Sequence, residues 1–414
     1  MDCAFFLFVS SLIAAGNVRV SLIFRSLMVQ HSLMRSRSVF TLSLIFFIGI
    51  QLHAQTDAEQ AEACIRQLMQ GSHVVGLSVA VVKKNKVVYT HAFGVRDLDT
   101  KSALSTNDMF RIASISKSFS ATSVMQLVEA GKLSLDMDVS DLLGFPVRNP
   151  KYPEIAITLR LLLSHLSSIN DSQGYSTLDC INPSKNPDWA KCYSDYAPGK
   201  GYKYCNLNFN MTGTIIERVS GERFDQYVKH HVLDPLGLYG GYCVDSLDRS
   251  RFAKIYEWKP DSIKFIASPG AYEPRSNEIA HYTMGYSAPL FSPTGGMKIS
   301  APDLAEWMIL HSKGGKHRGV RIISKKSSKL MQTPISTEEQ YGFAIEQTDK
   351  MIPGEHMTGH TGSAYGLYGA MFFNPKKKFG IVVISNGCDI DYQEGFNRVI
   401  RTAVNCLYDG FIRK

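Results

Sequence analysis

The most constraining feature of this chain of 414 residues is a pair of strand-turn-strand patterns near its opposite ends. Each consists of two runs rich in apolar and β-branched residues, separated by a short polar turn. These patterns predict hairpins, with strands at residues 74–82, 87–93, 368–373 and 379–385. Helical patterns at 57–70 and 394–408 flank them. We therefore expect an α+β fold, in which both chain ends form one antiparallel sheet flanked by helices.

The residues between the two hairpins carry mostly helical patterns. Apolar side chains recur there at helical spacing over residues 114–130, 158–164, 211–219, 224–232 and 301–311. Residues 170–200 are rich in Ser, Asn, Asp, Pro and Tyr and are expected to form a loop. The sequence thus predicts a mainly helical domain inserted at about residues 125–340.

The N-terminal region has the layout of an export signal. From Met34, a charged start at Arg35 and Arg37 precedes an apolar run and a small-residue site ending at Ala54. The run is shorter than the roughly 20 residues of a membrane span, although an uncleaved anchor stays open as an alternative. We interpret residues 1–33 as a mis-assigned upstream start, residues 34–54 as a signal peptide, and residues 55–414 as a periplasmic or secreted catalytic domain.

Composition excludes several classes of protein. With 44% hydrophobic and 20% charged residues, the chain is neither disordered nor fibrous. The net charge of +8 falls to +5 once the first 54 residues are removed, because they hold four arginines and one acidic residue. This mild, dispersed charge argues against nucleic acid as a partner. We expect a monomer with a small-molecule or peptide acyl substrate.

Seven cysteines follow Ala54, and none of them forms a CxxC motif. Without accompanying histidine spacing they do not predict a zinc site. An exported protein can form disulfides. Cys180 and Cys192 could close a short loop. Cys64 and Cys406 lie on the two predicted terminal helices, which we expect to pack together, so a bridge between them is also conceivable. The odd number leaves at least one free thiol.

The segment Phe110-Arg-Ile-Ala-Ser114-Ile-Ser-Lys117 opens a helical pattern that ends at Gly131. Ser114 and Lys117 are three residues apart and so share one helix face. A lysine in an apolar pocket loses its charge readily and can act as a base for a neighbouring serine. By itself the motif is weak, since Ser114 could be a helix cap and Lys117 a solvated side chain.

Two further motifs strengthen the catalytic interpretation. Tyr204-Cys205-Asn206 follows a loop, and Gly359-His360-Thr361-Gly362-Ser363 precedes the strand at Tyr368. Each motif is common when taken alone. All three in this order, with the serine early and the glycine-rich segment late, are hard to obtain by chance.

In these motifs the chain resembles the serine β-lactamase and penicillin-binding-protein superfamily. It is most similar to the branch of class C β-lactamases, D-alanyl-D-alanine carboxypeptidases and related esterases and acyltransferases. The resemblance covers about residues 72–406 and also includes Leu161-Leu-Leu-Ser-His165 and Gly295-Gly296. It implies a β-lactamase/transpeptidase-like fold, with the site between the sheet and the helical domain.

The resemblance also implies roles for individual residues. Ser114 would be the acylated nucleophile, Lys117 its base, Tyr204 the proton relay to the leaving group, and Asn206 an orienting group. The backbone N–H groups of Ser114 and Ser363 would stabilise the oxyanion. His360 would stabilise the ligand's charge or assist Tyr204, while Thr361 and Gly362 would border the substrate, with Gly362 letting it lie against the strand edge. No metal or organic cofactor is expected.

The chain departs from the family pattern at three places. His360 stands where the β-lactamases carry lysine, a difference that argues against antibiotic hydrolysis. Histidine at this position is more typical of the carboxypeptidase-like members. Cys205 stands where the family has serine, and His165 is followed by Leu-Ser-Ser. We expect Cys205 to be a packing residue, because alternate side chains of an extended segment face opposite ways. The resemblance implies a packing role for His165 as well, since it ends a predicted helix where the family uses this histidine for packing.

Three functions remain open from the sequence. The first is hydrolysis of an amide or ester, such as a D-amino-acid peptide, a small ester or a β-lactam-like substrate. The second is transfer of the acyl group from Ser114 to a small-molecule hydroxyl. The third is ligand binding without catalysis.

An aromatic cluster lies near the 170–200 loop and forms either a substrate wall or a small core of its own. Its members are Tyr175, Trp189, Tyr193, Tyr196 and Tyr202.

Overall fold

The structure is a computed structural model that describes residues 58–336 and 338–413. The chain divides into two compact units, residues 1–60 and 61–414, and the sheet and candidate site belong to the second. The expected upstream segment and signal peptide lie outside the described residues. Within the described residues, no helix has the length and apolar character needed to cross a bilayer.

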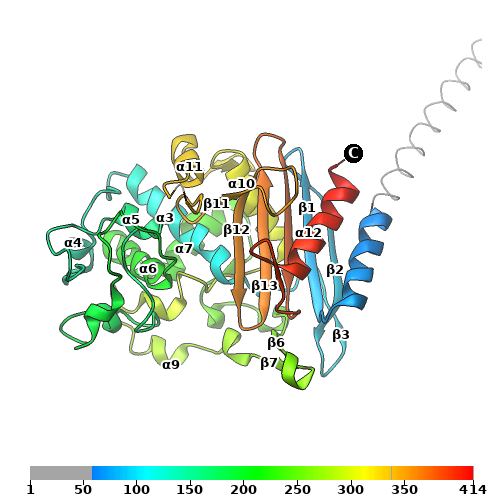
Figure 1. The fold of residues 1–414 in the computed structure, drawn as a ribbon, viewed down its shortest axis with the longest axis horizontal. Coiled ribbons are helices and arrows are strands. Elements are labelled where there is room, and N and C mark those ends of the chain that lie inside the picture. Colours follow the sequence, from blue (N-terminus) through cyan, green and yellow to red (C-terminus); the bar gives the residue numbers. More distant parts are fainter. Residues whose placement is uncertain (1–57, 337, 414) are drawn as a thin grey trace, which may run out of the picture. The chain divides into compact units, whose positions relative to one another are not determined.

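The central element is a seven-stranded antiparallel sheet in the order β11-β12-β13-β14-β1-β2-β3 (Figure 1). Its centre joins the two chain ends, because β1 pairs with β14 with Leu77 opposite Ser385. The expected fold class is therefore confirmed. The strands are β1 Gly76–Lys83, β2 Lys86–Asp97, β3 Ser102–Ala103, β11 Glu346–Thr348, β12 Met357–Ala364, β13 Leu367–Asn374 and β14 Phe379–Ser385.

Strand β1 explains why the sheet needs cover on both faces. Its side chains are almost all buried, although successive residues point to opposite faces. Leu77 and Val79 pack into the core beneath the terminal helices, whereas Ala80 and Val82 pack into the larger core on the helical-domain side. A strand that is apolar on both faces is typical of a sheet between two helical layers.

The two terminal helices cover one face of the sheet. They span residues 58–71 and α12 Arg398–Phe411, and a disulfide joins Cys64 to Cys406 between them. The bridge considered from the sequence is therefore present, whereas Cys180 and Cys192 are free thiols. The last helix begins four residues later than expected. The Asn397 side chain caps it by accepting a hydrogen bond from the N–H of Ile400.

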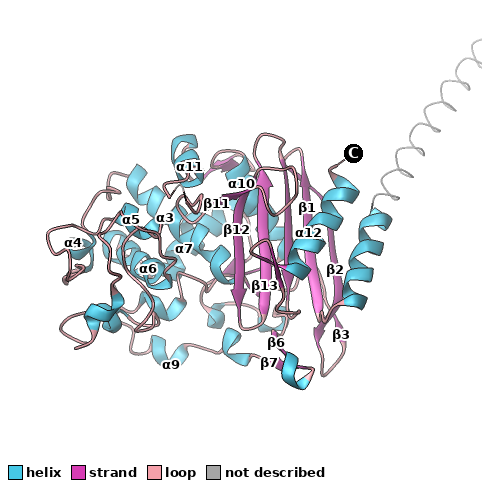
Figure 2. Cartoon of the chain, viewed as in Figure 1, coloured by secondary structure: helices cyan, strands magenta, loops and turns pink. Residues whose placement is uncertain are grey.

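The helices and short strands of the inserted region lie between β3 and β11 along the chain (Figure 2). The predicted helix at 114–130 is a 3-10 turn, η1 Ala113–Ser116, followed by α3. The helices are α3 Lys117–Glu129, α4 Val139–Leu143, α5 Leu159–Leu163, α6 Asn206–Ser220, α7 Phe224–Val228, α8 Asp234–Leu236, α9 Ser276–Ile279, α10 Ala301–Ser312 and α11 Lys325–Gln332. A three-stranded sheet joins β4 Phe110–Arg111, β8 Lys298–Ile299 and β5 Gly240–Gly241.

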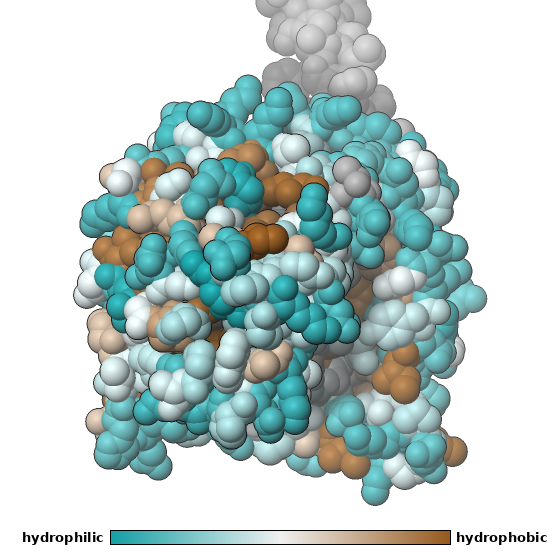
Figure 3. All heavy atoms as spheres, turned by 60° about the vertical axis from the view of Figure 1, so that its left-hand side comes forward, coloured by the Kyte–Doolittle hydropathy of each residue, from teal (hydrophilic) through white to brown (hydrophobic). Residues whose placement is uncertain are grey.

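The remaining strands form small hairpins away from the main sheet, with bounds β6 Tyr256–Lys259, β7 Lys264–Ala267, β9 Lys316–His317, β10 Val320–Arg321, β15 Tyr392–Gln393 and β16 Phe396–Asn397. The molecular face turned forward in Figure 3 is mainly hydrophilic, and its hydrophobic residues form small, separate patches. Large apolar side chains are instead concentrated in the two cores on either side of the main sheet.

Candidate active site

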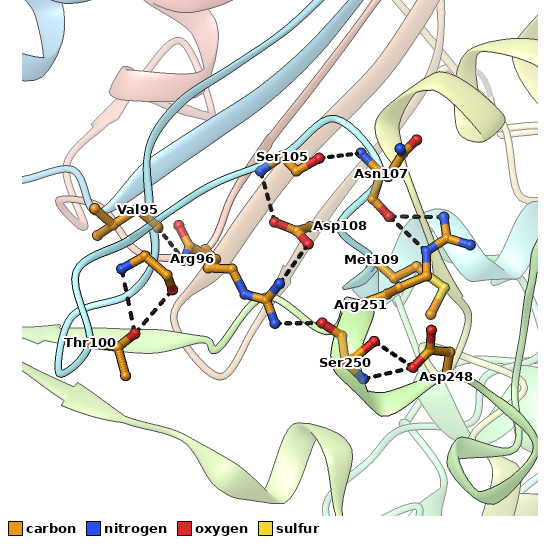
Figure 4. A network of polar contacts seen from close by, with 12 residues as sticks. Val95, Arg96, Thr100, Ser105, Asn107, Asp108, Met109, Asp248, Ser250 and Arg251 are labelled. Atoms are coloured by element: carbon orange, nitrogen blue, oxygen red, sulfur yellow. Dashed lines mark hydrogen bonds and ion pairs between the residues drawn. The ribbon is translucent and has the colours of Figure 1, made fainter.

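Ser114 lies in the turn between β4 and α3. The residue before it, Ala113, has a left-handed backbone conformation with φ 47°, which directs the chain sharply from strand to helix. Polar contacts fix the approach to this turn (Figure 4): the buried Asp108 carboxylate accepts hydrogen bonds from Arg96 and from the N–H of Ser105. Arg251 donates to the carbonyl of Asn107 at 3.0 Å. The nucleophile is thus presented by a firmly anchored segment.

Gly362 on β12 packs against the same turn. A Cβ atom at this position would lie 2.3 Å from the carbonyl oxygen of Ile112. The glycine therefore lets the strand approach the backbone next to Ser114. From the sequence we expected Gly362 to make room for substrate, whereas the space beside it is filled by the protein's own backbone.

Lys117 is completely buried on the first turn of α3. Its Nζ atom lies 3.0 Å from Ser114 Oγ, 2.9 Å from Asn206 Oδ1 and 3.1 Å from the carbonyl oxygen of Thr294. Burial lowers the pKa of Lys117 to about 7, against a weaker opposite effect of the Asp171 charge. A substantial fraction of this amine is therefore uncharged near neutral pH and able to accept the serine proton.

Asn206, the first residue of α6, is held in a defined orientation. Its Nδ2 atom donates to Asp171 Oδ2 at 3.0 Å, and its Oδ1 atom accepts from Thr294 Oγ1 at 2.9 Å as well as from Lys117. Asp171 also accepts hydrogen bonds from the main-chain N–H groups of Asn206 and Leu207. These bonds explain why α6 begins five residues earlier than its apolar pattern indicates.

The Tyr204 ring lies against the lysine, with Lys117 Nζ 4.7 Å from the ring centroid. The Tyr204 hydroxyl is buried and has no hydrogen-bond partner within the described part of the chain. Burial raises the pKa of Tyr204, an effect that the Ser114 side chain partly offsets. The phenol therefore keeps its proton, as a donor to a leaving group must.

His165 packs against Tyr204, with their ring centroids 4.3 Å apart. Its Nδ1 atom accepts a hydrogen bond from the N–H of Cys205 at 3.2 Å, and burial holds the pKa of His165 well below its usual value. Cys205 is fully buried and donates from its thiol to Asp171, and burial raises the pKa of that thiol. Both residues have the packing environment expected from the sequence.

His360 is uncharged near neutral pH. Its Nδ1–H donates to the carbonyl oxygen of Thr361 at 2.6 Å, which leaves Nε2 to accept from the Tyr341 hydroxyl at 3.0 Å. Burial, followed by the charge of Lys117, lowers the pKa of His360 to about 3. It therefore supplies no positive charge to a ligand, and both ring nitrogens are engaged away from Tyr204.

The expected site residues border one cavity of about 850 Å³. Those that line it are Ser114, Tyr204, Asn206, His360, Thr361 and Ser363. Lys117, which is buried next to Ser114, and Gly362, which lies on β12, are not among the residues that line it. On the outer side of β12, pairing with β11 covers only residues 357–359 in the described structure, so Thr361 and Ser363 lie on an open strand edge next to Ser114.

Several further residues of the site were missed in the sequence. Asp171, Thr294 and Tyr341 hold the predicted residues in place, and nothing in their local sequence distinguishes them. Glu346 also lines the cavity; its Oε1 atom is buried without a hydrogen-bond partner among the described residues, and burial raises its pKa to about 7. Glu346 lies a few residues after Tyr341-Gly342 in the sequence, and this proximity is only a weak indication that it belongs to the site.

The aromatic cluster near the 170–200 loop contributes both to the wall of the cavity and to the packed core. Tyr175 and Tyr202 line the cavity, whereas Trp189 packs edge-on against Tyr193, which belongs to the core. No group of three or more metal-binding side chains occurs in residues 58–336 and 338–413.

Comparison with known proteins decides the family. A family model described as "Beta-lactamase" matches residues 61–399. The chain belongs to the Beta-lactamase family. This places it in the superfamily of β-lactamase/transpeptidase-like serine hydrolases, as the motifs around Ser114, Tyr204 and His360 suggested.

Individual relatives of this family member are distant. "Protein flp" from Staphylococcus aureus (strain MW2) is 25% identical over 339 residues, which cover 79% of this chain and 63% of the relative. The chain thus spans less than two thirds of that relative's length. The D-amino acid amidase from Ochrobactrum anthropi SV3 has the same fold, with a TM-score of 0.68, 18% identity, and coverage of 87% and 100% of the two chains. EstCE1, "a hydrolase with promiscuous acyltransferase activity", matches with a TM-score of 0.67, 20% identity, and coverage of 86% and 98%.

Proposed function

We propose that this protein is an active-site-serine hydrolase that cleaves an amide or ester through an acyl-enzyme at Ser114. One observation carries the proposal: a buried lysine whose pKa is lowered to about 7 lies 3.0 Å from the serine hydroxyl. A buried amine that is uncharged near neutral pH is a suitable general base for an alcohol nucleophile.

In the proposed acylation, uncharged Lys117 takes the proton of Ser114 as Oγ attacks the substrate carbonyl carbon. The carbonyl oxygen becomes an oxyanion, which the main-chain N–H groups of Ser114 and Ser363 would stabilise by about 3 kcal/mol each. The intermediate collapses as the bond to the leaving group breaks, and Tyr204 protonates that group. Proton transfer from Lys117 to the resulting phenolate restores Tyr204.

Deacylation reverses these roles. A water molecule gives up a proton to the Lys117–Tyr204 pair and attacks the ester carbonyl. The carbon–Oγ bond then breaks, Oγ regains a proton, and the free acid leaves. Asn206 keeps Lys117 directed at Oγ throughout, since its Oδ1 atom accepts from the lysine.

Intact-mass spectrometry with a penicillin and with an activated ester tests this function. An adduct on the wild-type protein that is absent from Ser114→Ala is the expected result. Ser176→Ala is the matched control, because Ser176 lines the same cavity but has no part in the proposed acyl transfer. If no acyl donor modifies the folded protein, the chain is a ligand-binding protein instead.

Acyl transfer to an alcohol is the second candidate function. The cavity of about 850 Å³ has room for an acceptor beside the acyl group, and Tyr202, Tyr204 and Tyr341 give it an aromatic wall. EstCE1, which shares the fold, combines both activities in its description. Product analysis with and without an added alcohol separates the two: an ester product identifies the transferase, and free acid alone identifies the hydrolase.

We also propose that residues 55–414 are exported and act as a monomer without a nucleic-acid partner. The Cys64–Cys406 disulfide supports export, because such bonds persist mainly in oxidising compartments. The face drawn in Figure 3 is mainly hydrophilic, which argues against an apolar self-association surface on that face. Cell fractionation with detection of the mature N-terminus near Gln55 tests the first proposal, and light scattering tests the second.

A further inference from the structure

Two cations face each other at one end of the cavity. Arg111 on β4 and Lys298 on β8 are directly opposite in the antiparallel register, so their side chains leave the same face of the three-stranded sheet. Both line the cavity that contains Ser114. Like charges at directly opposite positions are unfavourable unless something between them compensates.

Neither cation forms an ion pair with a carboxylate in the described part of the chain. Arg111 donates from Nε to the carbonyl oxygen of Gly295 at 2.9 Å and from one terminal nitrogen to Ser292 Oγ at 3.2 Å. Lys298 donates to the carbonyl oxygen of Tyr242 at 2.6 Å. Each side chain thus keeps at least one N–H donor that no acceptor among the described residues uses.

The lysine is the more unusual of the two. Only 4% of Lys298 is exposed, and its neighbour across the sheet on β5 is Gly241, which adds no side chain beside it. Burial, and then the charges of Arg111 and Arg275, holds the pKa of Lys298 well below its usual value. Such a buried amine costs stability unless a partner is bound, which is typical of a functional position.

Basic side chains outnumber carboxylates among the residues that line this end of the cavity. Arg275 also lines it and pairs with Glu278 at 2.9 Å, while Glu273 is the one lining carboxylate nearby in the described chain. Asp225, whose charge also acts on Lys298, pairs with Arg223. Glu346, the other lining carboxylate, belongs to the opposite end, because β11 places it across from Gly359.

The open edge of β12 shows which part of a substrate this end would receive. Tyr204, the proposed donor to the leaving group, packs near His360, with ring centroids 6.3 Å apart. Arg111 lies over Tyr365, just beyond the other end of the strand, 4.8 Å from its ring centroid. The leaving group therefore belongs on the His360 side and the acyl chain on the side of Arg111 and Lys298.

We propose that Arg111 and Lys298 form a carboxylate-binding subsite, so that the preferred acyl donor carries an anionic group at the far end of a short acyl chain. Ser114 is three positions after Arg111 in the chain, so their Cα atoms are at most about 11 Å apart. A five-carbon dicarboxylic acyl group is of suitable length. The inference rests on the proposed acyl-enzyme function and names the substrate class of that site.

Three p-nitroanilides that differ only in terminal charge test the subsite. They carry the glutaryl (anionic), pentanoyl (neutral) and 5-aminopentanoyl (cationic) groups. We expect kcat/KM to fall in that order, by about 10- to 100-fold between the first two, as for one charge-assisted contact. Equal rates for the three would overturn the proposal while leaving the hydrolase function intact.

Lys298→Met keeps the length of the side chain and removes its charge at a buried position, so the variant is expected to fold and to unfold at a higher temperature. The ratio of glutaryl to pentanoyl kcat/KM should fall about 10-fold or more. Lys254→Met is the matched control, because Lys254 is exposed and paired with Asp97 and Asp99. A ratio unchanged in Lys298→Met would contradict the assignment.

Binding to Ser114→Ala separates failure of the subsite from failure of the catalytic proposal. Calorimetry should show tighter binding of the glutaryl than of the pentanoyl anilide. If that preference is found but the wild-type protein turns over neither anilide, the subsite stands and the acyl-enzyme function fails. Equal affinities would overturn the subsite, whatever the activity.

Discussion

The carboxylate of Asp171 binds the amide nitrogen of Asn206 at 3.0 Å, and this contact turns the amide oxygen toward Lys117. The same carboxylate caps α6 through two main-chain N–H groups. One acidic residue in the 170–200 loop therefore fixes both the start of a helix and the orientation of a catalytic side chain.

Replacing Asp171 should lower activity by more than the accompanying loss of stability can explain. In Asp171→Asn one of the two acceptor oxygens becomes an N–H donor, so hydrogen bonds to the Asn206 amide or to the start of α6 are lost; we expect kcat to fall about 10- to 100-fold and the free energy of unfolding to fall by about 1–2 kcal/mol. Kinetics and denaturant unfolding measure these effects. Asp188→Asn is the control, since Asp188 lies on the same loop and forms an ion pair with Lys191 at the surface; a similar loss there would contradict the assignment.

The lowered pKa of Lys117 predicts a pH-dependent rate. Because the base must be uncharged, kcat/KM for an amide should rise with pH and level off above an inflection near pH 7. In Asp171→Asn the inflection should move to lower pH, since Asp171 raises the pKa of Lys117. A rate independent of pH between about 5 and 9 would exclude Lys117 as the base.

The same pKa predicts a pH-dependent stability. Between about pH 7 and 10.5 the unfolded lysine is protonated while the folded one is not, so the unfolded state binds more protons and stability increases with pH. Below about pH 7 both states are protonated and the cost of burying the charge is fully present. Lys117→Met removes this dependence. Unfolding at about pH 6 and about pH 9 should therefore show a larger advantage of the variant at the lower pH.

Tyr204→Phe tests the proton relay through its dependence on the leaving group. Removing a general acid should slow an anilide about 100-fold or more, whereas a nitrophenyl ester should be affected far less because its leaving group needs no proton. The hydroxyl makes no hydrogen bond in the described structure, so thermal stability should not fall. Tyr202→Phe, in the same cavity, is the control. Equal losses on both substrates would rule out this role.

Gly362→Ala should displace the serine turn. The added Cβ would lie 2.3 Å from the carbonyl oxygen of Ile112, and neither backbone can move freely. We expect a loss of about 1–3 kcal/mol in the free energy of unfolding together with loss of acylation. Gly71→Ala, which adds a Cβ into open space, should leave both unchanged. Normal acylation by Gly362→Ala would show that the turn tolerates this displacement.

Local pattern in the sequence was sufficient for much of the fold. The hairpins at both chain ends have strong strand patterns, and the observed strands match them within a few residues. Ser114 and Lys117 could be paired from their spacing, because three residues in a helical turn bring side chains together. The family motifs added Tyr204, Asn206 and the His360–Ser363 segment, which the structure gathers around one cavity.

Only the tertiary structure decided how these residues are held and charged. Asp171 meets Asn206 across 35 residues, and Arg111 meets Lys298 across a register between strands distant in the chain. No local pattern encodes such contacts, because they depend on how the inserted region folds back onto the sheet. The pKa values of Lys117 and His360 likewise follow from burial among distant segments. The sequence by itself determined the fold class and the chemical groups available, and packing determined their protonation and orientation, since desolvation and long-range contacts arise only in the assembled fold.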